Sequence, residues 1–324
     1  MFLRALRPFA ARAMSSAATP LILSPSQVHA LIQSKNSFIK LLDATWFMPN
    51  SPRNARQEFV SRRLPGAHFL DLDQVASSHE LGLKHMMPSG RVFADACEEY
   101  GIEPSSHVIL YDTQGVFSSP RALFMFRSFR HNNSSIINGG LPLWLSEGLP
   151  VEQGSPSQAT RSIYPTPALN ATAIRNYEQI VANSALKPTI ESTAELVVDA
   201  RSKGRYLGVD PEPRPGLSSG HIPHSLSLPF NVFLKKHPRF DTSEFTTLLS
   251  PLELRKALED TIGAECANLV LNGELPVVTS CGSGMTAGIL WLGLKTLGVK
   301  RIGLYDESWT GYAMRSTSKI EKSS

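Results

Sequence analysis

Cys281 is the residue of this sequence best placed for covalent chemistry. It follows an apolar run that predicts a buried strand, 276–280, and it opens the loop Cys-Gly-Ser-Gly-Met-Thr, 281–286, before a predicted helix at about 287–297. In open parallel α/β sheets, reactive groups gather where the strands end. Two glycines let successive backbone N–H groups point into one concavity, and the helix adds its positive N-terminus. The loop therefore favours a thiolate, which can act as a nucleophile or carry a persulfide.

Similar loops serve three chemistries, and two of them are disfavoured here. A Walker phosphate-binding loop needs a lysine after its second glycine, where Met285 stands. A cysteine phosphatase needs an arginine six positions after the cysteine to clamp phosphate, and that position is Ala287. Sulfur transfer is the third. Cys97 and Cys266 lie in predicted helical or loop segments without such a turn, so we interpret both as structural.

The elements that must position Cys281 occur twice along the chain. Each half has an apolar strand ending in aspartate, a proline-containing turn, a central strand followed by a helix, and a last short strand before a tryptophan. The corresponding residues are Asp43 and Asp199, Pro65 and Pro223, strands 108–112 and 276–280, and Trp144 and Trp309. Alternating strands and helices predict an α/β fold with two domains, each a parallel sheet flanked by helices.

The two halves differ at the end of the central strand. Asp112 stands in the first half where Cys281 stands in the second, so only the second half is expected to be catalytic. In the first half, Ser119 is predicted to be the N-cap of the next helix, with Pro120 at its first position.

Composition shifts divide the chain into four segments. They are a leader at 1–19, a first domain at 20–151, a linker rich in Ser, Pro and Gln at 152–169, and a second, catalytic domain at 170–324. The leader contains three arginines and no acid, which is typical of a mitochondrial transit peptide. We expect a mitochondrial protein, and translation from Met14 would add a cytoplasmic pool.

Charge and cysteine content exclude several other classes. Taking the three leader arginines from the net charge of +4 leaves +1, so nothing favours a nucleic-acid partner. No run of 18 apolar residues predicts a membrane span. The three cysteines are too few for a disulfide scaffold, and an odd number cannot all pair within the chain. They point to a reducing compartment. Neither CxxC nor HExxH occurs, so no metal site is expected. The proposed chemistry requires no organic cofactor either.

After the leader, the chain resembles the two-domain rhodanese-type sulfurtransferases. CGSGMT is similar to the CGSGVT loop of the family's 3-mercaptopyruvate branch, whereas the thiosulfate branch carries Arg and Lys directly after the cysteine. Met285 replaces the usual valine, and Glu307 replaces a glycine. Other matching runs are LLDATW at 41–46, VVDARSKGRYLG at 197–208, PEPR at 211–214, GHIP at 220–223 and YDESW at 305–309.

The resemblance implies tandem rhodanese-like domains and transfer of sulfur from 3-mercaptopyruvate, through a Cys281 persulfide, to thioredoxin, a small dithiol or cyanide, with release of pyruvate. It also implies roles for particular residues. Arg205 and Arg214 would bind the substrate beside the loop residues Gly282, Gly284, Met285 and Thr286, and Ser283, His85 and Asp73 would form a proton relay.

Three alternatives stay open at this point. The donor could be thiosulfate, with cyanide as acceptor. The protein could instead pass persulfide to a partner in a thiolation pathway such as that of tRNA. Arg205 and Arg214 could be ordinary surface charges or ion-pair partners of Asp210 and Glu212. Arg201, two residues after Asp199, is interpreted as a structural ion-pair partner.

Overall fold

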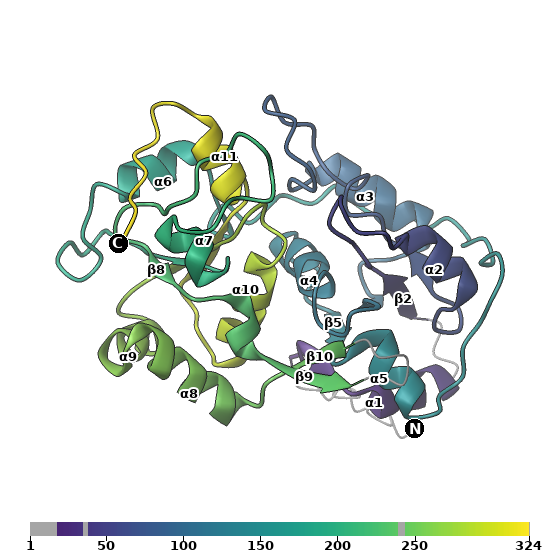
Figure 1. The fold of residues 1–324 in the computed structure, drawn as a ribbon. Helices are drawn as coiled ribbons and strands as arrows, with labels where there is room; N and C mark the ends of the chain where they lie inside the picture. Colours follow the sequence, from purple (N-terminus) through teal and green to yellow (C-terminus); the bar gives the residue numbers. More distant parts are fainter. Residues whose placement is uncertain (1–17, 35–37, 239–243, 324) are drawn as a thin grey trace, which may run out of the picture.

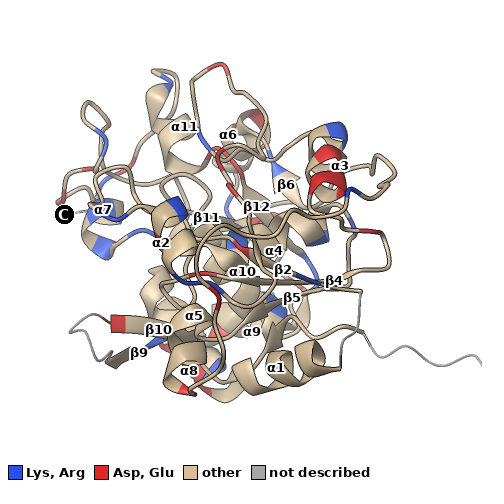
Figure 2. Cartoon of the chain, turned by 90° about the vertical axis from the view of Figure 1, so that its right-hand side faces the viewer, with Lys and Arg blue, Asp and Glu red and all other residues tan. Residues whose placement is uncertain are grey.

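A computed structural model describes residues 18–34, 38–238 and 244–323. Its two halves lie side by side, the first coloured purple to teal and the second teal to yellow in Figure 1. Residues 1–17, which hold most of the predicted leader, lie outside the described residues. Lys and Arg are interspersed with Asp and Glu over the side shown in Figure 2. Among the helices described, none has both the length and the apolar character needed to cross a membrane.

The first half is a parallel sheet with helices packed around it. The sheet order is β1-β5-β4-β2-β3, with every pairing parallel. The elements are β1 (Ile22–Leu23), α1 (Pro25–Gln33), β2 (Ile39–Asp43), α2 (Ala55–Ser61), β3 (His68–Phe69), α3 (Gly90–Glu99), β4 (His107–Tyr111), α4 (Ser119–Ser128), β5 (Ser134–Ile137) and α5 (Gly140–Ser146).

The second half repeats this order and adds a hairpin. Its parallel sheet runs β6-β12-β11-β7-β8. The elements are β6 (Ile174–Arg175), α6 (Tyr177–Asn183), β7 (Leu196–Asp199), α7 (Lys203–Leu207), β8 (Leu226–Ser227), a 3-10 turn η1 (Phe230–Phe233), the antiparallel hairpin β9 (Leu234–Pro238) and β10 (Glu244–Leu248), α8 (Pro251–Ile262), α9 (Ala264–Asn272), β11 (Val277–Ser280), α10 (Ala287–Thr296), β12 (Ile302–Tyr305) and α11 (Ser308–Met314).

The matching strand orders confirm the predicted fold class, an α/β fold with two parallel sheets flanked by helices. β4 and β11 occupy the same place in their sheets, and both are fully buried apart from the first residue of β4. Residues 153–170, between the halves, form neither helix nor strand. The domain boundaries at 151 and 169 stay a prediction.

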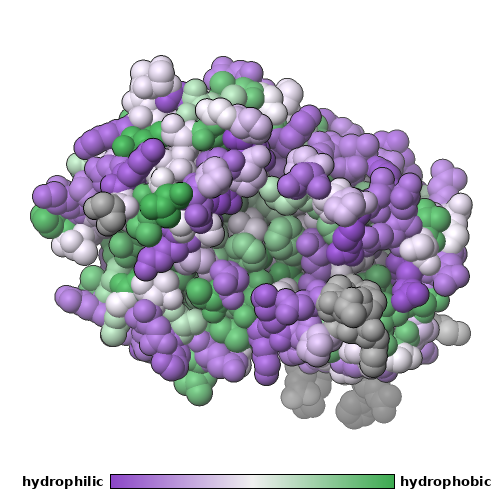
Figure 3. Space-filling view, viewed as in Figure 1, coloured by the Kyte–Doolittle hydropathy of each residue, from purple (hydrophilic) through white to green (hydrophobic). Residues whose placement is uncertain are grey.

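The halves meet where α4 packs against α10, side by side at the centre of Figure 1. A Cβ on Gly288 would lie 2.8 Å from the backbone nitrogen of Arg121, so glycine permits this close approach. Phe124 meets Trp291 edge to face, with ring centroids 5.3 Å apart. One hydrophobic cluster runs through both halves as a result. Figure 3 shows a recess between the halves with apolar residues on its floor and polar residues around it.

Each half also sends a segment across to the other. The segment between β3 and α3 reaches the second half, where the backbone N–H of Met87 donates to Asp306 Oδ2 at 2.8 Å. The hairpin between β8 and α8 reaches the first half, where the N–H of Thr246 donates to the Gln114 carbonyl at 3.0 Å. Each crossing segment thus lies beside a loop that follows a strand of the opposite sheet.

One local prediction is wrong. α4 begins at Ser119, and its N-cap is Ser118, whose side chain makes no capping hydrogen bond. The hydroxyl of Ser119 instead donates to Asp112 Oδ2 at 2.7 Å. A buried carboxylate competes for that hydroxyl, and the sequence around Ser119 gives no sign of it.

The aspartates at the ends of β2 and β7 have different surroundings. Asp199 is paired with the buried Arg201, whose Nη2 lies 2.5 Å from its Oδ2. Thr45 stands at the corresponding place after Asp43 and offers only hydrogen bonds from its N–H and hydroxyl. Burial therefore raises the pKa of Asp43 to about 7, although the Thr45 hydrogen bonds oppose the shift.

This difference predicts a pH-dependent stability. Because native Asp43 keeps its proton up to about pH 7 and the unfolded chain loses it near pH 4, the native state binds more protons in between. Its stability then falls as pH rises from about 4 to 7. Asp43→Asn removes this titration, so its free energy of unfolding should fall less between pH 5 and 8 in urea titrations, and should exceed the wild-type value at pH 8.

The matched control is Asp199→Asn. It deprives the buried Arg201 of a charged partner, so we expect lower stability than wild type at every pH in that range. Parallel pH profiles for wild type and Asp43→Asn would contradict the assignment.

Candidate active site

Cys281 lies directly after β11 and is 2% exposed. Its Sγ accepts a hydrogen bond from the N–H of Gly284 at 3.1 Å. The start of α11 fixes the cysteine backbone, because Cys281 N–H donates to Ser308 Oγ at 3.1 Å and Trp309 N–H donates to the Cys281 carbonyl at 2.9 Å. Gly284 has a φ of +85°, which lets the loop turn back on the sulfur.

The loop offers further donors. In the described part of the chain, the N–H groups of Ser283, Met285 and Thr286 have no acceptor. The structure thus shows one N–H donor on the sulfur, and the wider cradle of N–H groups stays a prediction.

The same turn in the first half is filled by a carboxylate. Asp112 is fully buried, and its Oδ2 accepts backbone N–H groups from Phe117, Ser118 and Ser119 at 2.9, 3.1 and 3.0 Å. Its Oδ1 accepts the N–H of Gln114 at 2.9 Å. A carboxylate therefore occupies the position of the sulfur, and the first half offers no thiol there.

Both arginines implied by the family resemblance converge on the loop. Arg205 Nη2 and Arg214 Nη1 lie 3.2 and 3.9 Å from the point that a Cβ on Gly282 would occupy. Arg205 comes from α7 and is held by Glu212, with its Nε 3.1 Å from Oε1. Arg214 takes part in no ion pair with the described residues. Arg205 is thus an ion-pair partner of Glu212, as one of the alternatives supposed, but both guanidinium groups still face the loop.

Glu212 is fixed from its other side by Arg201. The Arg201 Nη1 lies 2.6 Å from Glu212 Oε1, and the guanidinium stacks 4.1 Å from the Trp309 ring centroid. The Glu212 side chain is only 2% exposed. A buried network therefore sets the position of Arg205, with Arg201 in the structural role that the sequence suggests.

His85 and Asp73 are in contact. His85 Nδ1 and Asp73 Oδ1 are 2.9 Å apart, and Trp46 Nε1 donates to Asp73 Oδ2 at 3.1 Å. Burial alone would raise the pKa of Asp73, but the hydrogen bonds from His85 and Trp46 and the charge of Lys84 outweigh it and lower the pKa. An ionised Asp73 fixes the His85 ring with its Nδ1 proton toward the carboxylate.

Ser283 is not joined to this pair. It is half-buried and makes no hydrogen bond with His85 or Asp73 in the described residues. The Nε2 of His85 is buried and likewise has no partner among the described residues. His85 has a φ of 46°, a left-handed conformation that costs a non-glycine residue energy. Of the three residues in the relay implied by the resemblance, His85 and Asp73 are in contact and Ser283 is apart from them in the described residues.

Sequence reasoning missed Arg121 and Asp306, which hold the crossing segment to the active loop. Buried Arg121 donates through Nη2 to the His85 carbonyl at 2.7 Å and to Asp306 Oδ1 at 2.6 Å. Its Nη1 lies 3.3 Å from the Cβ position of Gly284. These residues are far apart in the sequence, so no local pattern could have paired them. The YDESW run was the one signal that included Asp306.

Glu307, the other departure from the family pattern, also bridges the halves. It is paired with Arg315, and its Oε1 lies 3.7 Å from His79 Nε2 in the crossing segment. The acid that replaces a glycine thus lies beside the segment that carries His85. In the described residues, no group of three or more His, Cys, Asp or Glu side chains could hold a metal ion.

Comparisons with known proteins identify the family to which the chain belongs. A family model described as "Rhodanese-like domain" matches residues 182–315. A probable 3-mercaptopyruvate sulfurtransferase of Schizosaccharomyces pombe is 36% identical over 85% of this chain and 87% of its own. A thiosulfate sulfurtransferase of Bos taurus is 37% identical over 84% of each chain. The crystal structure of Tum1 from Saccharomyces cerevisiae superposes with a TM-score of 0.80 at 26% identity, covering 94% of this chain and 99% of that one.

Two parallel sheets of matching strand order, together with these relatives, define a sulfurtransferase of the two-domain type. The chain belongs to the rhodanese family.

The loop geometry predicts a specific role for Gly284. A Cβ at this position would lie 2.8 Å from the Asp306 carbonyl oxygen, so Gly284→Ala must displace the N–H that contacts Sγ. We expect kcat/KM for sulfur transfer to fall at least tenfold, measured by release of the desulfurated product.

Gly298→Ala is the matched control. Gly298 has a φ of +87°, so alanine costs about 1–2 kcal/mol of backbone strain at either site, but nothing lies within 4 Å of its Cβ position. Equal activities for the two variants would refute the role of the Gly284 N–H.

Proposed function

We propose that the protein transfers sulfur from 3-mercaptopyruvate to a thiol acceptor through a persulfide on Cys281. The observation that carries this proposal is the convergence of two guanidinium groups, from Arg205 and Arg214, on a loop with no cationic side chain of its own. This arrangement suits a donor whose negative charge lies away from its sulfur.

The choice of donor follows from charge placement. Thiosulfate is a compact dianion and favours cations directly beside the thiolate, where Gly282 and Ser283 offer none. Mercaptopyruvate carries one carboxylate several bonds from its sulfur. A guanidinium binds a carboxylate with two parallel hydrogen bonds, so Arg214 and Arg205 are suited to hold the carboxylate and keto oxygens while the sulfur points to Cys281.

The first half-reaction balances without a cofactor. The Cys281 thiolate attacks the substrate sulfur, an S–S bond forms, and the C–S bond breaks with its electron pair passing to the methylene carbon. The resulting enolate takes up the proton that the substrate thiol carried, giving pyruvate and the Cys281 persulfide anion. The loop N–H groups then stabilise the charge on the outer sulfur.

We propose that His85 moves this proton. Ser283, which makes no hydrogen bond with His85 among the described residues, would be a further member of the relay. Support comes from the ionised Asp73, which orients the ring, and from the buried Nε2, which has no other partner among the described residues. A thiol then attacks the outer sulfur and regenerates the Cys281 thiolate. Thioredoxin, a small dithiol or cyanide fits this second step.

Thiosulfate remains a second candidate donor because the bovine thiosulfate sulfurtransferase is 37% identical to this chain. Mitochondrial location, with a cytoplasmic pool from Met14, is also a proposal, and it rests on the composition of residues 1–19.

The first test is the covalent intermediate. Protein incubated with 3-mercaptopyruvate should gain about 32 Da on Cys281 in peptide mass spectrometry, which is one sulfur atom. Cys281→Ser should gain no mass and release no pyruvate, while Cys266→Ser, a half-buried cysteine elsewhere, should behave as wild type. Pyruvate release by Cys281→Ser would overturn the nucleophile. Faster persulfide formation from thiosulfate, with both donors at equal concentration, would reverse the choice of donor.

The second test concerns the substrate carboxylate. Arg214→Gln should raise KM for 3-mercaptopyruvate at least tenfold with a smaller effect on kcat, because the guanidinium binds a part of the substrate that does not react. Arg255→Gln is the control, since Arg255 is exposed on α8 and paired with Glu259. A KM for Arg214→Gln within twofold of wild type would rule out this role.

A further inference from the structure

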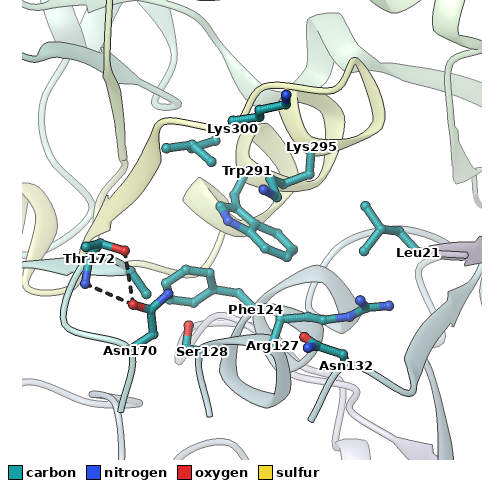
Figure 4. A pocket seen from close by; sticks show the side chains of 12 residues that line it. Leu21, Phe124, Arg127, Ser128, Asn132, Asn170, Thr172, Trp291, Lys295 and Lys300 are labelled. Atoms are coloured by element: carbon teal, nitrogen blue, oxygen red, sulfur yellow. Dashed lines mark hydrogen bonds between the residues drawn. The ribbon is translucent and has the colours of Figure 1, made fainter. Parts of the chain in front are cut away.

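A cavity separate from the Cys281 loop lies between the two halves, near the C-terminal ends of α4 and α10. Its volume is about 300 Å³, at the lower end of the range for small-molecule sites. Figure 4 shows Arg127 and Asn132 on one side, Lys295, Lys300 and Trp291 on the other, and Asn170 at the edge. Cys281 precedes the N-terminus of α10, so the cavity is at the opposite end of this helix.

The charge of this cavity is not balanced. Arg127, Lys295 and Lys300 line it, and no acidic residue does. None of the three cations forms an ion pair within the described residues. The Nε of Arg127 is buried and has no hydrogen-bond partner in the described part of the chain.

The hydrogen bonds that the cations do make are to neutral carbonyls. Arg127 Nη2 donates to Ser134 and Thr19 oxygens at 2.5 and 3.1 Å, and Lys295 Nζ donates to the Val299 oxygen at 3.3 Å. These contacts satisfy polar atoms near the helix ends but leave the positive charge uncompensated. Burial lowers the pKa of Arg127 to about 10, and burial together with the Arg127 charge lowers the pKa of Lys295.

Neutral donors complete the lining. The side-chain oxygen of Asn170 accepts hydrogen bonds from the N–H and hydroxyl of Thr172, at 3.2 and 3.0 Å. Its amide nitrogen has no acceptor in the described residues, so it is available to a ligand oxygen. The side chains of Asn132 and Ser128 also line the cavity. Trp291 and Phe124 form its apolar wall, as Figure 4 shows.

We propose that this cavity binds a small dianion whose negative charges are on carboxylate or phosphate oxygens. A monoanion would leave most of the charge of three cations unbalanced, and a large ligand would exceed the volume. The dianion would contact residues of both halves and so stabilise their junction. It would not compete with the sulfur donor, because the two sites lie at opposite ends of α10. This proposal does not depend on the identity of that donor.

Binding is tested with succinate and inorganic phosphate as dianions and acetate as the monoanion, all at constant ionic strength. Calorimetric titration and thermal unfolding of the wild-type protein should show saturable binding and a rise in Tm with at least one dianion, and neither with acetate. The dianion that binds identifies carboxylate or phosphate as the preferred group. Binding of neither dianion, or an equal rise with acetate, would overturn the proposal.

Matched variants locate the site. Lys295→Gln/Lys300→Gln should weaken dianion binding at least tenfold, whereas Lys256→Gln, which removes an exposed lysine from α8, should change it less than twofold. Lys300→Gln alone, at an exposed position, gives the same test if the double variant is unstable. Arg214→Gln should bind as wild type. Unchanged affinity in the Lys295/Lys300 variants, or lost binding in Arg214→Gln, would refute the site.

Discussion

A side-chain group held by backbone N–H groups at the end of a central strand is the constraint on which both halves of this molecule depend. In the first half the group is the Asp112 carboxyl, with four backbone N–H groups on its two oxygens. In the second half the group is the Cys281 sulfur, with one N–H on it and others nearby. The carboxyl accepts four N–H groups of its turn, whereas the sulfur accepts one. Under the proposed function, the remaining donors would serve the outer sulfur of a persulfide.

Neither half could form this active site alone. The loop of Cys281 comes from the second half, while His85 and Asp73 come from a segment of the first. Arg121 and Asp306 join the two across the junction, and both are held by more than one hydrogen bond. The hairpin of the second half lies beside the Asp112 turn in return. The two halves therefore exchange covering segments, and a cysteine stands at the covered turn of the second half alone.

The sequence predicts the parts of this arrangement that depend on local order. Consecutive residues form the strand before Cys281, its glycine loop and the following helix, so a local pattern predicts all three. The repeat of that order along the chain predicts the two parallel sheets. Local sequence patterns could not predict contacts between segments that are distant in the sequence. Nothing near Arg121 indicates that it would bind the His85 carbonyl, and nothing near Ser119 indicates that Asp112 would take its hydroxyl. His85 and Asp73 were placed only by family resemblance, because histidine in a loop has no distinctive local pattern.

The arginines around the Cys281 loop differ in whether an acid neutralises them. Asp199 and Glu212 are neutralised by Arg201 and Arg205 in a network that is buried except for part of Arg205. Arg214 is then the one cation beside Gly282 that the described residues leave unneutralised. Under the proposed function, this single uncompensated positive charge would match the single carboxylate of the substrate. In the first half, Thr45 stands in the place of Arg201, and the buried Asp43 is left without a cation.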